Sequence, residues 1–478
     1  MTRVPRAMST QHPDNVAVPF FASGPVMGGE DEIREAFYAY SHLGCDEQMW
    51  DFEGKEVDEF VVEKLLSSYE SFFREHPLGD DVRLTPRVPN PGLEKAQGKV
   101  LLEVLHSIPR HSDVSRIFYR REREPIVEVI FPMTTSAEEL LRVREHYRTR
   151  IAALDDDPTL RSWFGEFKPD DIAVIPLVED RDSLLAADRI VSEYARAARV
   201  DEMRVFIARS DPALNYGFVP AVLYSLVALA RLSRVGIATH PIIGVGGPAF
   251  RGGLRPDSVD RVLSRYPSVE TFTIQSAFKY DHPVDDVVRA IRTLREAPRR
   301  APVELDEDRA IALADRVAAR YREEIVAVAP LVRAISEHVP RRRMRKLHIG
   351  LFGYARQTNG VSLPRTIPFV AALYGLGLPP EILGLSAIGA EDLDWLRASI
   401  PCIDSDLTHA LAYLDPEIAG VHPPLSGSVD AALRLGVERK AADHLELARE
   451  TRRRLASGET RQIDEMITRS AALRHFIG

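Results

Sequence analysis

Cysteine is scarce in this sequence: Cys45 and Cys402 are the only two in 478 residues. Two thiols cannot form the disulfide framework of a small secreted domain, and neither cysteine has a zinc-ligand spacing to a histidine. We therefore expect free thiols, buried as small apolar side chains in a reducing compartment.

Long uncharged stretches and an excess of positive charge are also missing. The longest apolar run, 369–383, is interrupted by glycines, a Pro-Pro pair and Glu381, and no basic segment with an apolar core opens the chain. We expect no membrane partner and a cytoplasmic protein. The 62 basic and 71 acidic side chains give a net charge of -9, which argues against a nucleic-acid partner.

Linkers, repeats and low-complexity segments are absent as well, so residues 1–478 are predicted to form a single compact unit. The sequence instead alternates short apolar runs with long amphipathic segments, such as 136–151 and 182–198. Eight runs are predicted strands: 46–53, 82–89, 126–133, 172–179, 203–210, 239–246, 271–278 and 346–353. Apolar strands separated by helices are typical of parallel sheets. The predicted fold class is α/β, a (β/α)8 TIM-type barrel elaborated with additional α-helices, especially C-terminal ones.

The predicted organisation has three parts. Residues 1–45 form an N-terminal catalytic segment and helix, residues 46–360 form the barrel with a helical insertion at about 305–340, and residues 361–478 form a C-terminal helical region. The basic cluster "RRRMRK" (341–346) is interpreted as a solvated turn before the last strand.

Charged side chains gather at the predicted carboxyl ends of the strands, where a barrel of this type carries its chemistry. Glu179 and Asp211 follow neighbouring strands, and carboxylates of this kind suit a hard cation such as Mg²⁺ or Mn²⁺. Arginines beside a glycine-rich loop suit a phosphate, because a guanidinium binds its oxygens in pairs. Further candidates at these ends are Arg87, Arg209, Arg251, Arg255, Gln275 and Lys279. Each residue alone is as well explained by a helix cap or a salt bridge, so the prediction depends on their coincidence on one rim.

A general base is not apparent on the rim itself. His12, in "MSTQHPDN" (8–15), precedes the first predicted strand and is held by Pro13 and by the hydrogen bonds of Asp14 and Asn15. We expect His12 to cover the site from outside the barrel. The alternative is that it merely caps a turn.

Several longer motifs resemble one family. "MSTQHPDN" followed by "PFF", with "VIPLVED", "ARSDPALNYG", "GGPAFRGGLRP" and "YARQTNGVSLPRTIPF", is similar to phosphoenolpyruvate carboxylase of the short, archaeal type, from His12 to about Leu383. The larger bacterial and plant carboxylases have similar motifs in the same order. One departure is Val245, which stands where the larger enzymes carry the first of two arginines. The resemblance leaves Arg251 as the second, and the duty of the first falls on Arg87, Arg209 or Arg255.

The resemblance implies the reaction of phosphoenolpyruvate with bicarbonate to give oxaloacetate and phosphate, through carboxyphosphate and a metal-stabilised enolate. It implies anaplerotic carbon fixation, Mg²⁺ or Mn²⁺ on Glu179 and Asp211, and a homotetramer. Catalytic roles are then expected for His12, Arg251 and Arg209. Substrate binding is expected for Arg87, Arg255, Lys279, Gln275 and Arg365.

Two other functions stay open. The first is another Mg²⁺-dependent barrel lyase that acts on pyruvate-like enolates, of the citrate-lyase or malate-synthase kind, which has no need of several phosphate-binding arginines. The second is a catalytically inactive relative that binds a metabolite, which the presence of His12, Glu179, Asp211 and Arg251 together argues against.

Overall fold

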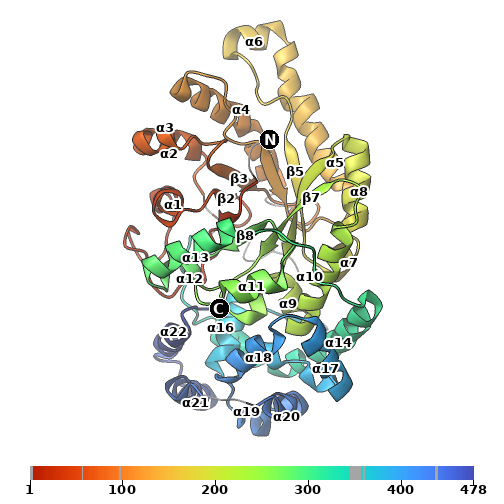
Figure 1. Cartoon of the computed structure of the whole chain (residues 1–478). Helices are drawn as coiled ribbons and strands as arrows, with labels where there is room; N and C mark the ends of the chain where they lie inside the picture. The colour runs from red at the N-terminus through yellow and green to blue at the C-terminus, as the bar shows by residue number, and fades with distance from the viewer. Residues whose placement is uncertain (1–3, 56, 96–97, 345–356, 359–360, 437–439) are drawn as a thin grey trace.

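Eight parallel strands form a closed barrel at the centre of the molecule (Figure 1). The computed structural model describes residues 4–55, 57–95, 98–344, 357–358, 361–436 and 440–478. The strands follow one another around the barrel in chain order, and the first pairs with the last. They are β1 (Ala7–Ser9), β2 (Glu47–Asp51), β3 (Arg83–Arg87), β4 (Glu128–Phe131), β5 (Ala173–Val178), β6 (Glu202–Ala208), β7 (Ala238–Gly244) and β8 (Thr271–Ile274).

The predicted barrel is confirmed, but the set of strands that forms it differs from the prediction at its beginning and at its end. The seven expected runs from 46–53 to 271–278 each supply one strand, β2 to β8. The remaining strand, β1, lies inside the segment 1–45, which was expected outside the barrel; three residues are too few to give a periodic signal. Because β1 pairs with both β2 and β8, the barrel closes without residues 346–353, which lie outside the described residues. Its strands therefore span Ala7 to Ile274 instead of 46–360.

Side chains that alternate along the strands fill the barrel in layers. An apolar layer lies at mid-height and consists of Met8, Met49, Ile130, Ile175, Leu177, Phe206, Ala208 and Ile242. Continuing the period of two toward the carboxyl ends brings Asp51, Arg87 and Glu179 onto the same inner face. The alternation of each strand thus places charged groups in the mouth of the barrel.

Helices connect successive strands and cover the outside of the barrel (Figure 1). Up to the last barrel strand they are α1 (Glu30–Tyr38), α2 (Val61–Ser68), α3 (Glu70–Glu75), α4 (Gly98–Tyr119), α5 (Ala137–His146), α6 (Pro158–Phe164), α7 (Arg181–Leu185), α8 (Ala187–Ala198), α9 (Ser210–Tyr216), α10 (Phe218–Leu232) and α11 (Val259–Arg265). After it come α12 (Ser276–Tyr280), α13 (Val284–Glu296), α14 (Glu307–Ser336), α16 (Thr366–Gly375), α17 (Ala390–Ser399), α18 (Ile403–Leu411), α19 (Ile418–Val421), α20 (Ser426–Arg434), α21 (Ala442–Ser457) and α22 (Ile463–Arg474). A short hairpin of β9 (Gln357–Thr358) and β10 (Val361–Ser362) precedes α16.

Local capping explains where the predicted helices begin. Ser136 and Glu139 form a reciprocal capping box at the start of α5, and Asp306 accepts the N–H of Arg309 at the start of α14. A helix is thereby found where one was expected at about 305–340, but α14 follows the last barrel strand and is no insertion within the barrel. The segment 182–198 is broken at Ala186 into α7 and α8.

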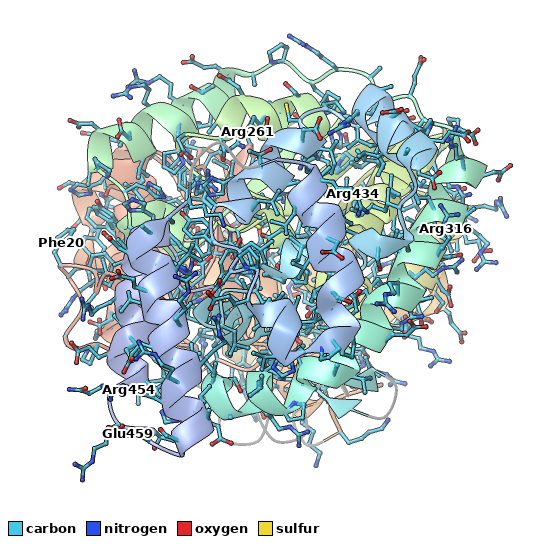
Figure 2. The ribbon with its side chains drawn as sticks, turned by 90° about the horizontal axis from the view of Figure 1, so that it is seen from below. Phe20, Arg261, Arg316, Arg434, Arg454 and Glu459 are labelled. Atoms are coloured by element: carbon cyan, nitrogen blue, oxygen red, sulfur yellow. The ribbon has the colours of Figure 1, made fainter. Side chains whose placement is uncertain are left out.

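The helices from α16 to α22 gather at the end of the barrel where the strands have their carboxyl ends (Figure 1), and Figure 2 shows them in front when the molecule is seen from below. The chain returns to the barrel at its very end, because the N–H of Ile477 donates to the carbonyl oxygen of Asp14 at 2.7 Å. The C-terminal helical region therefore covers the end of the barrel that carries the predicted site.

No single described helix is long and apolar enough to cross a membrane. One sharply bent pair, Thr366–Gly375 with Pro380–Ala387, reaches the required length and composition. Most of its residues are buried inside this molecule.

Candidate active site

The loop after β1 carries His12 into the mouth of the barrel. β1 ends at Ser9, which is in register with Ile274 at the end of β8, so both chains leave the barrel at the same rim. The carbonyl oxygen of His12 accepts the N–H of Ser276 at 3.3 Å, and its Nδ1 lies 2.9 Å from Oγ1 of Thr10. The expectation that His12 comes from outside the barrel was wrong, because the loop that carries it continues directly from β1, a strand of the barrel wall.

The surroundings of His12 keep its imidazole neutral. Burial lowers its pKa well below the ordinary 6.5, and the positive charges of Lys55, Arg87, Arg251 and Arg343 lower the pKa further. A neutral imidazole keeps one nitrogen that can take up a proton. His12 is therefore in the state of a general base at neutral pH and below.

Two carboxylates from neighbouring strands lie close together on the rim. Glu179 follows β5, and Asp211 lies in the first turn of α9 after β6. Burial raises the pKa of Glu179 well above its ordinary value, and the nearby charges of Asp211 and Glu53 raise it further. One oxygen of Glu179 accepts the N–H of Met133 at 2.9 Å. Like charges held together in this way favour a bound cation.

The fit to Mg²⁺ or Mn²⁺ follows from this donor set. Among the described residues, no group of three or more His, Cys, Asp and Glu has the arrangement of a metal site. Glu179 and Asp211 therefore offer two protein ligands at most from this set. That suits Mg²⁺, which commonly keeps several waters and binds through one or two carboxylates and substrate oxygens.

Arg209 carries an unsatisfied positive charge into the site. Its side chain has no exposed surface, and its Nε donates to the hydroxyl of Tyr266 at 2.9 Å. Neither Nη1 nor Nη2 has a hydrogen-bond partner among the described residues. A buried cation in this state is costly, and an anion that accepts from both nitrogens would satisfy it.

Arg251, in the glycine-rich loop after β7, and Gln275, which follows β8, form one buried group. Nη2 of Arg251 donates to Oε1 of Gln275 at 2.5 Å, its Nε to Ser210 at 3.1 Å, and its Nη1 to Asp14 at 3.1 Å. A Cβ on Gly246 would lie 2.9 Å from Oε1 of Gln275 and 3.0 Å from Cζ of Arg251. Glycine at this position lets the backbone pass this close to both side chains.

Arg87 lies on the rim, but carboxylates of the protein already neutralise its positive charge. Its Nε and Nη2 each donate to one oxygen of Asp51 at 2.7 Å, across the β2–β3 pair in which these two residues are in register. Its Nε also lies 3.3 Å from Glu53, and Lys55 is a second cation paired with Asp51. These four side chains form an ion-pair network along one side of the mouth.

Lys279, predicted to bind substrate, is fully engaged by the protein. Its ammonium donates to Ser9 Oγ at 3.0 Å, to Thr10 O at 3.0 Å and to Glu35 Oε1 at 2.7 Å. Those three bonds use all three of its N–H groups. Lys279 therefore fixes the end of β1 against α1, and the structure does not bring its ammonium to the open rim.

The other two predicted substrate-binding arginines lie at the edge of this group. Nε of Arg255 donates to Asp257 at 3.0 Å; burial lowers the pKa of His409 in the C-terminal helical region to about 4, and the positive charge of Arg255 contributes to this shift. Arg365 occupies the N-cap position of α16, and its charge partly opposes the rise that burial causes in the pKa of Glu94, in the loop after β3. Arg365 is thus on the rim, whereas Arg255 points toward the C-terminal helices.

The basic cluster 341–346 was misinterpreted as a solvated turn in its described part. Arg343 is buried and donates to Glu32 at 2.6 Å and to Glu35 at 2.5 Å. Arg342 donates to the carbonyl oxygens of Asn15 at 3.2 Å and Val16 at 2.9 Å. Arg342 therefore holds the segment that carries His12, and Arg343 is paired with α1.

The C-terminal tail is a part of the site that sequence reasoning missed. The carbonyl oxygen of Gly478 accepts from Nη1 of Arg251 at 2.5 Å, and the carbonyl oxygen of Ile477 accepts from Arg474 at 3.1 Å. Ile477 is buried against Ala371. Apolar residues followed by glycine at the end of a chain were the only available signal, and they carry no catalytic pattern.

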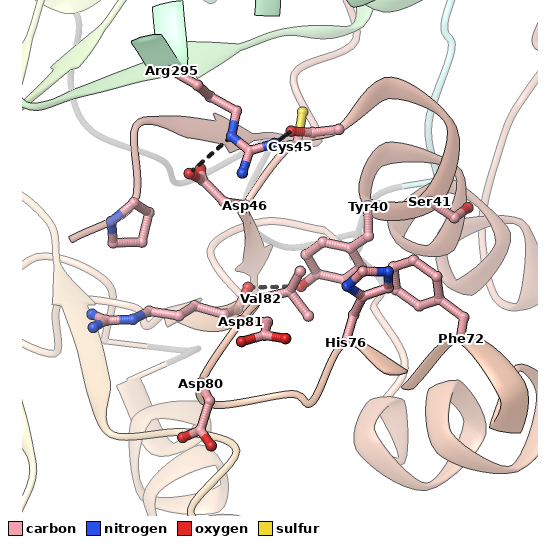
Figure 3. Close-up of a pocket in the computed structure, with 13 residues that line it drawn as sticks. Tyr40, Ser41, Cys45, Asp46, Phe72, His76, Asp80, Asp81, Val82 and Arg295 are labelled. Atoms are coloured by element: carbon pink, nitrogen blue, oxygen red, sulfur yellow. Dashed lines mark hydrogen bonds and ion pairs between the residues drawn. The ribbon is translucent and has the colours of Figure 1, made fainter. Parts of the chain in front are cut away.

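Two cavities open at the opposite end of the barrel. One, of about 460 Å³, lies between β2, β3 and the helices before them and is lined by Tyr40, Cys45, Asp46, His76 and Arg295, among others (Figure 3). The other, of about 520 Å³, is lined by residues at the amino ends of β4 to β7. No rim residue lines either cavity. Both cysteines are free as expected, and burial raises the pKa of Cys45 to about 12.

The comparison with protein families decides between the possible functions. The family model described as phosphoenolpyruvate carboxylase matches residues 4–478. The chain belongs to the phosphoenolpyruvate carboxylase family. The carboxylase of Methanothermobacter thermautotrophicus is 45% identical over 485 residues, with 100% of each chain covered. That of Pyrococcus horikoshii is 52% identical over 423 residues, 87% of this chain and 90% of the relative.

Membership of the phosphoenolpyruvate carboxylase family covers the C-terminal helices as well, which carry no motif that sequence reasoning could place. Another barrel lyase is therefore not favoured. Among solved structures, a malate synthase of Haloferax volcanii with pyruvate and acetyl-CoA overlaps 68% of this chain and 81% of its own. Its TM-score is 0.39 at 12% identity, so this likeness carries no argument.

Proposed function

We propose that this protein converts phosphoenolpyruvate and bicarbonate into oxaloacetate and phosphate. The observation that carries the proposal is the arrangement of unmatched charge on one rim in a member of this family. The neutral His12, the buried Arg209 and the paired carboxylates of Glu179 and Asp211 all follow barrel strands at their carboxyl ends. This combination suits an anionic phosphorylated substrate, a cation and one proton transfer.

The first step transfers the phosphoryl group. A bicarbonate oxygen forms a bond to phosphorus while the bond between phosphorus and the enol oxygen breaks, which gives carboxyphosphate and the enolate of pyruvate. Arg209 and Arg251 are the buried cations that would neutralise the phosphate oxygens. A divalent cation held by Glu179 and Asp211 would supply Lewis-acid stabilisation of the phosphate and enolate oxygens.

The second step needs a base and the absence of water. His12 would take the carboxyl proton of carboxyphosphate, whose bond to phosphate then breaks to release CO2 and phosphate. The enolate carbon forms the new bond to CO2. An enolate that meets water gives pyruvate instead. The C-terminal helices that cover this end of the barrel would keep water away from it.

The experiment is a coupled assay for oxaloacetate, read as NADH loss through malate dehydrogenase, with and without bicarbonate and Mg²⁺. Wild-type turnover that requires both additions supports the proposal. The His12→Asn variant should form no oxaloacetate and still release phosphate, because His12 acts after the phosphoryl step. No oxaloacetate from the wild type under any of these conditions would contradict the function.

The same proposal includes a metal requirement, a homotetramer and a cytoplasmic location. Mn²⁺ and Mg²⁺ should each restore activity to enzyme that has been treated with a chelator. Light scattering of the purified chain would test the tetramer, and cell fractionation would test the location.

A further inference from the structure

Glu94 is a buried carboxyl that the steps above do not use. It lies in the loop between β3 and α4, its exposed fraction is 6%, and neither Oε1 nor Oε2 has a hydrogen-bond partner among the described residues. The loop itself is well held. The N–H of Glu94 donates to the carbonyl oxygen of Asn90 at 2.9 Å, and the side-chain amide of Asn90 donates to that of Pro132 at 3.0 Å. The backbone thus fixes a carboxyl that the protein leaves unsatisfied.

The charged groups that face Glu94 all belong to the rim of the site. Within the described part of the chain they are Glu53 after β2, Arg87 at the end of β3 and Arg365 at the start of α16. Burial raises the pKa of Glu94 to about 7, Glu53 raises it as well, and the two arginines oppose this rise. An anionic substrate on the rim would add negative charge. Burial and a bound anion would therefore both favour the neutral carboxylic acid form of Glu94.

We propose that Glu94 is the bicarbonate-binding residue, because its buried carboxyl oxygens have no hydrogen-bond partner within the described residues. The inference rests on the proposed carboxylase function and deepens it. The O–H of Glu94 donates to one bicarbonate oxygen, and its other oxygen accepts from the O–H of bicarbonate. The two groups thus form a pair of parallel hydrogen bonds, and Arg365 lies near enough to oppose the charge of the anion.

This pairing also distinguishes bicarbonate from the other substrate. A fully ionised phosphate or carboxylate has no O–H to donate to Glu94, so it can form only one of the two bonds. An ionised Glu94 would repel every anion. Binding of bicarbonate should therefore weaken as the pH rises through the pKa of Glu94, whereas binding of phosphoenolpyruvate should not depend on this group.

The test is the KM for each substrate as a function of pH, with the bicarbonate concentration corrected for its equilibrium with CO2. Glu94→Ala should raise the KM for bicarbonate by about tenfold or more, as expected for a lost hydrogen bond to a charged group. The KM for phosphoenolpyruvate should stay near the wild-type value. Glu94→Gln keeps one donor and one acceptor without a titrating proton. It should therefore bind bicarbonate like the wild type at pH 6.5 but lose the rise in KM above about pH 7.

The matched control is Glu324→Gln, the same change at a buried glutamate of α14 that accepts from Ser428 and Gly384. It should leave both KM values unchanged. An unchanged KM for bicarbonate in Glu94→Ala, or a wild-type pH dependence in Glu94→Gln, would overturn the role of Glu94. Wild-type enzyme that makes no oxaloacetate would instead overturn the proposed function, so the two failures are distinguishable.

Discussion

At the amino ends of the barrel strands, the buried Arg204 donates to Glu47 at 2.6 Å and to Glu128 at 2.9 Å. At the carboxyl ends, Glu179 lies beside another carboxylate, and the two terminal nitrogens of Arg209 have no partner among the described residues. The same barrel thus pairs Arg204 at one end, whereas at the other end it holds Glu179 beside a like charge and leaves the terminal nitrogens of Arg209 unsatisfied within the described residues. The first arrangement stabilises the folded chain, and the second favours ligands that complete it.

Two of the cavities lie at the end of the barrel that does not carry the candidate site. The cavities of about 460 and 520 Å³ lie at the amino ends, where the charges are paired (Figure 3). The site at the carboxyl ends is covered by the C-terminal helices and by the tail that ends at Gly478. These two cavities would therefore direct attention to the wrong end, and the volume of about 690 Å³ between α21 and α22 is lined by no rim residue either, whereas unmatched charge directs it to the site.

The largest effect is expected from Glu179→Gln. Oxaloacetate formation should fall about a thousandfold, because stabilisation by a metal ion is worth several kcal/mol. Metal-free wild type should lose stability as the pH rises above about 4.5, since the folded state holds the proton of Glu179 more tightly than the unfolded state does. The variant should lack this loss and have the higher Tm at pH 8. The coupled assay would measure the loss of oxaloacetate formation. Thermal melts with a chelator and with added Mg²⁺ would measure the pH dependence of stability and the difference in Tm. Equal stabilisation of variant and wild type by Mg²⁺ would contradict the metal site.

Arg204→Met tests the other end. Removing the cation leaves Glu47 and Glu128 buried without it, and the free energy of unfolding should fall by about 3–5 kcal/mol. Chemical denaturation would measure this change, and kcat per folded molecule should stay near the wild-type value. The matched double variant Arg204→Met/Glu47→Met should regain part of the lost stability. A variant as stable as the wild type, or one that folds but has lost its activity, would break the contrast between the two ends.

Gly478→Ala tests the tail that covers the site. A Cβ on Gly478 would lie 2.2 Å from the carbonyl oxygen of Ile367, so the tail must shift away from Arg251. Overpacking of this kind costs about 1–3 kcal/mol, and we expect kcat to fall about tenfold or more. Gly420→Ala is the control, since a Cβ there has no atom within 4 Å among the described residues. Equal kcat values for the two variants would exclude the tail from the site.

The smallest effect concerns pH. Because the pKa of His12 lies well below 6.5, its base form should persist as the pH falls from 8 to 6.5. At saturating bicarbonate, kcat should therefore change by less than about twofold over this range. An ordinary histidine would lose half of its base form at pH 6.5. The prediction fails if the wild-type kcat is halved at pH 6.5 while the rate of phosphate release by His12→Asn is not. That result would show that the surroundings do not hold His12 neutral.

The class of fold and most of the rim could be predicted from the order of the residues alone. Buried strands that alternate with helices give apolar runs of a readable length, so seven of the eight strands were predictable. Glu179, Asp211, Arg209 and Arg251 were predictable because chemistry at the carboxyl ends follows from the direction of the strands.

The rest could not be predicted, because it depends on contacts between distant parts of the chain. β1 is too short to have a period and exists through its pairing with β2 and β8. The sequence makes Lys279 a plausible substrate ligand, but in the folded protein its three N–H groups donate to Ser9, Thr10 and Glu35. Gly478 reaches Arg251 across 227 positions of sequence. Charge and periodicity are local properties that a sequence displays, whereas the partner that satisfies a buried charge is chosen only when the chain folds.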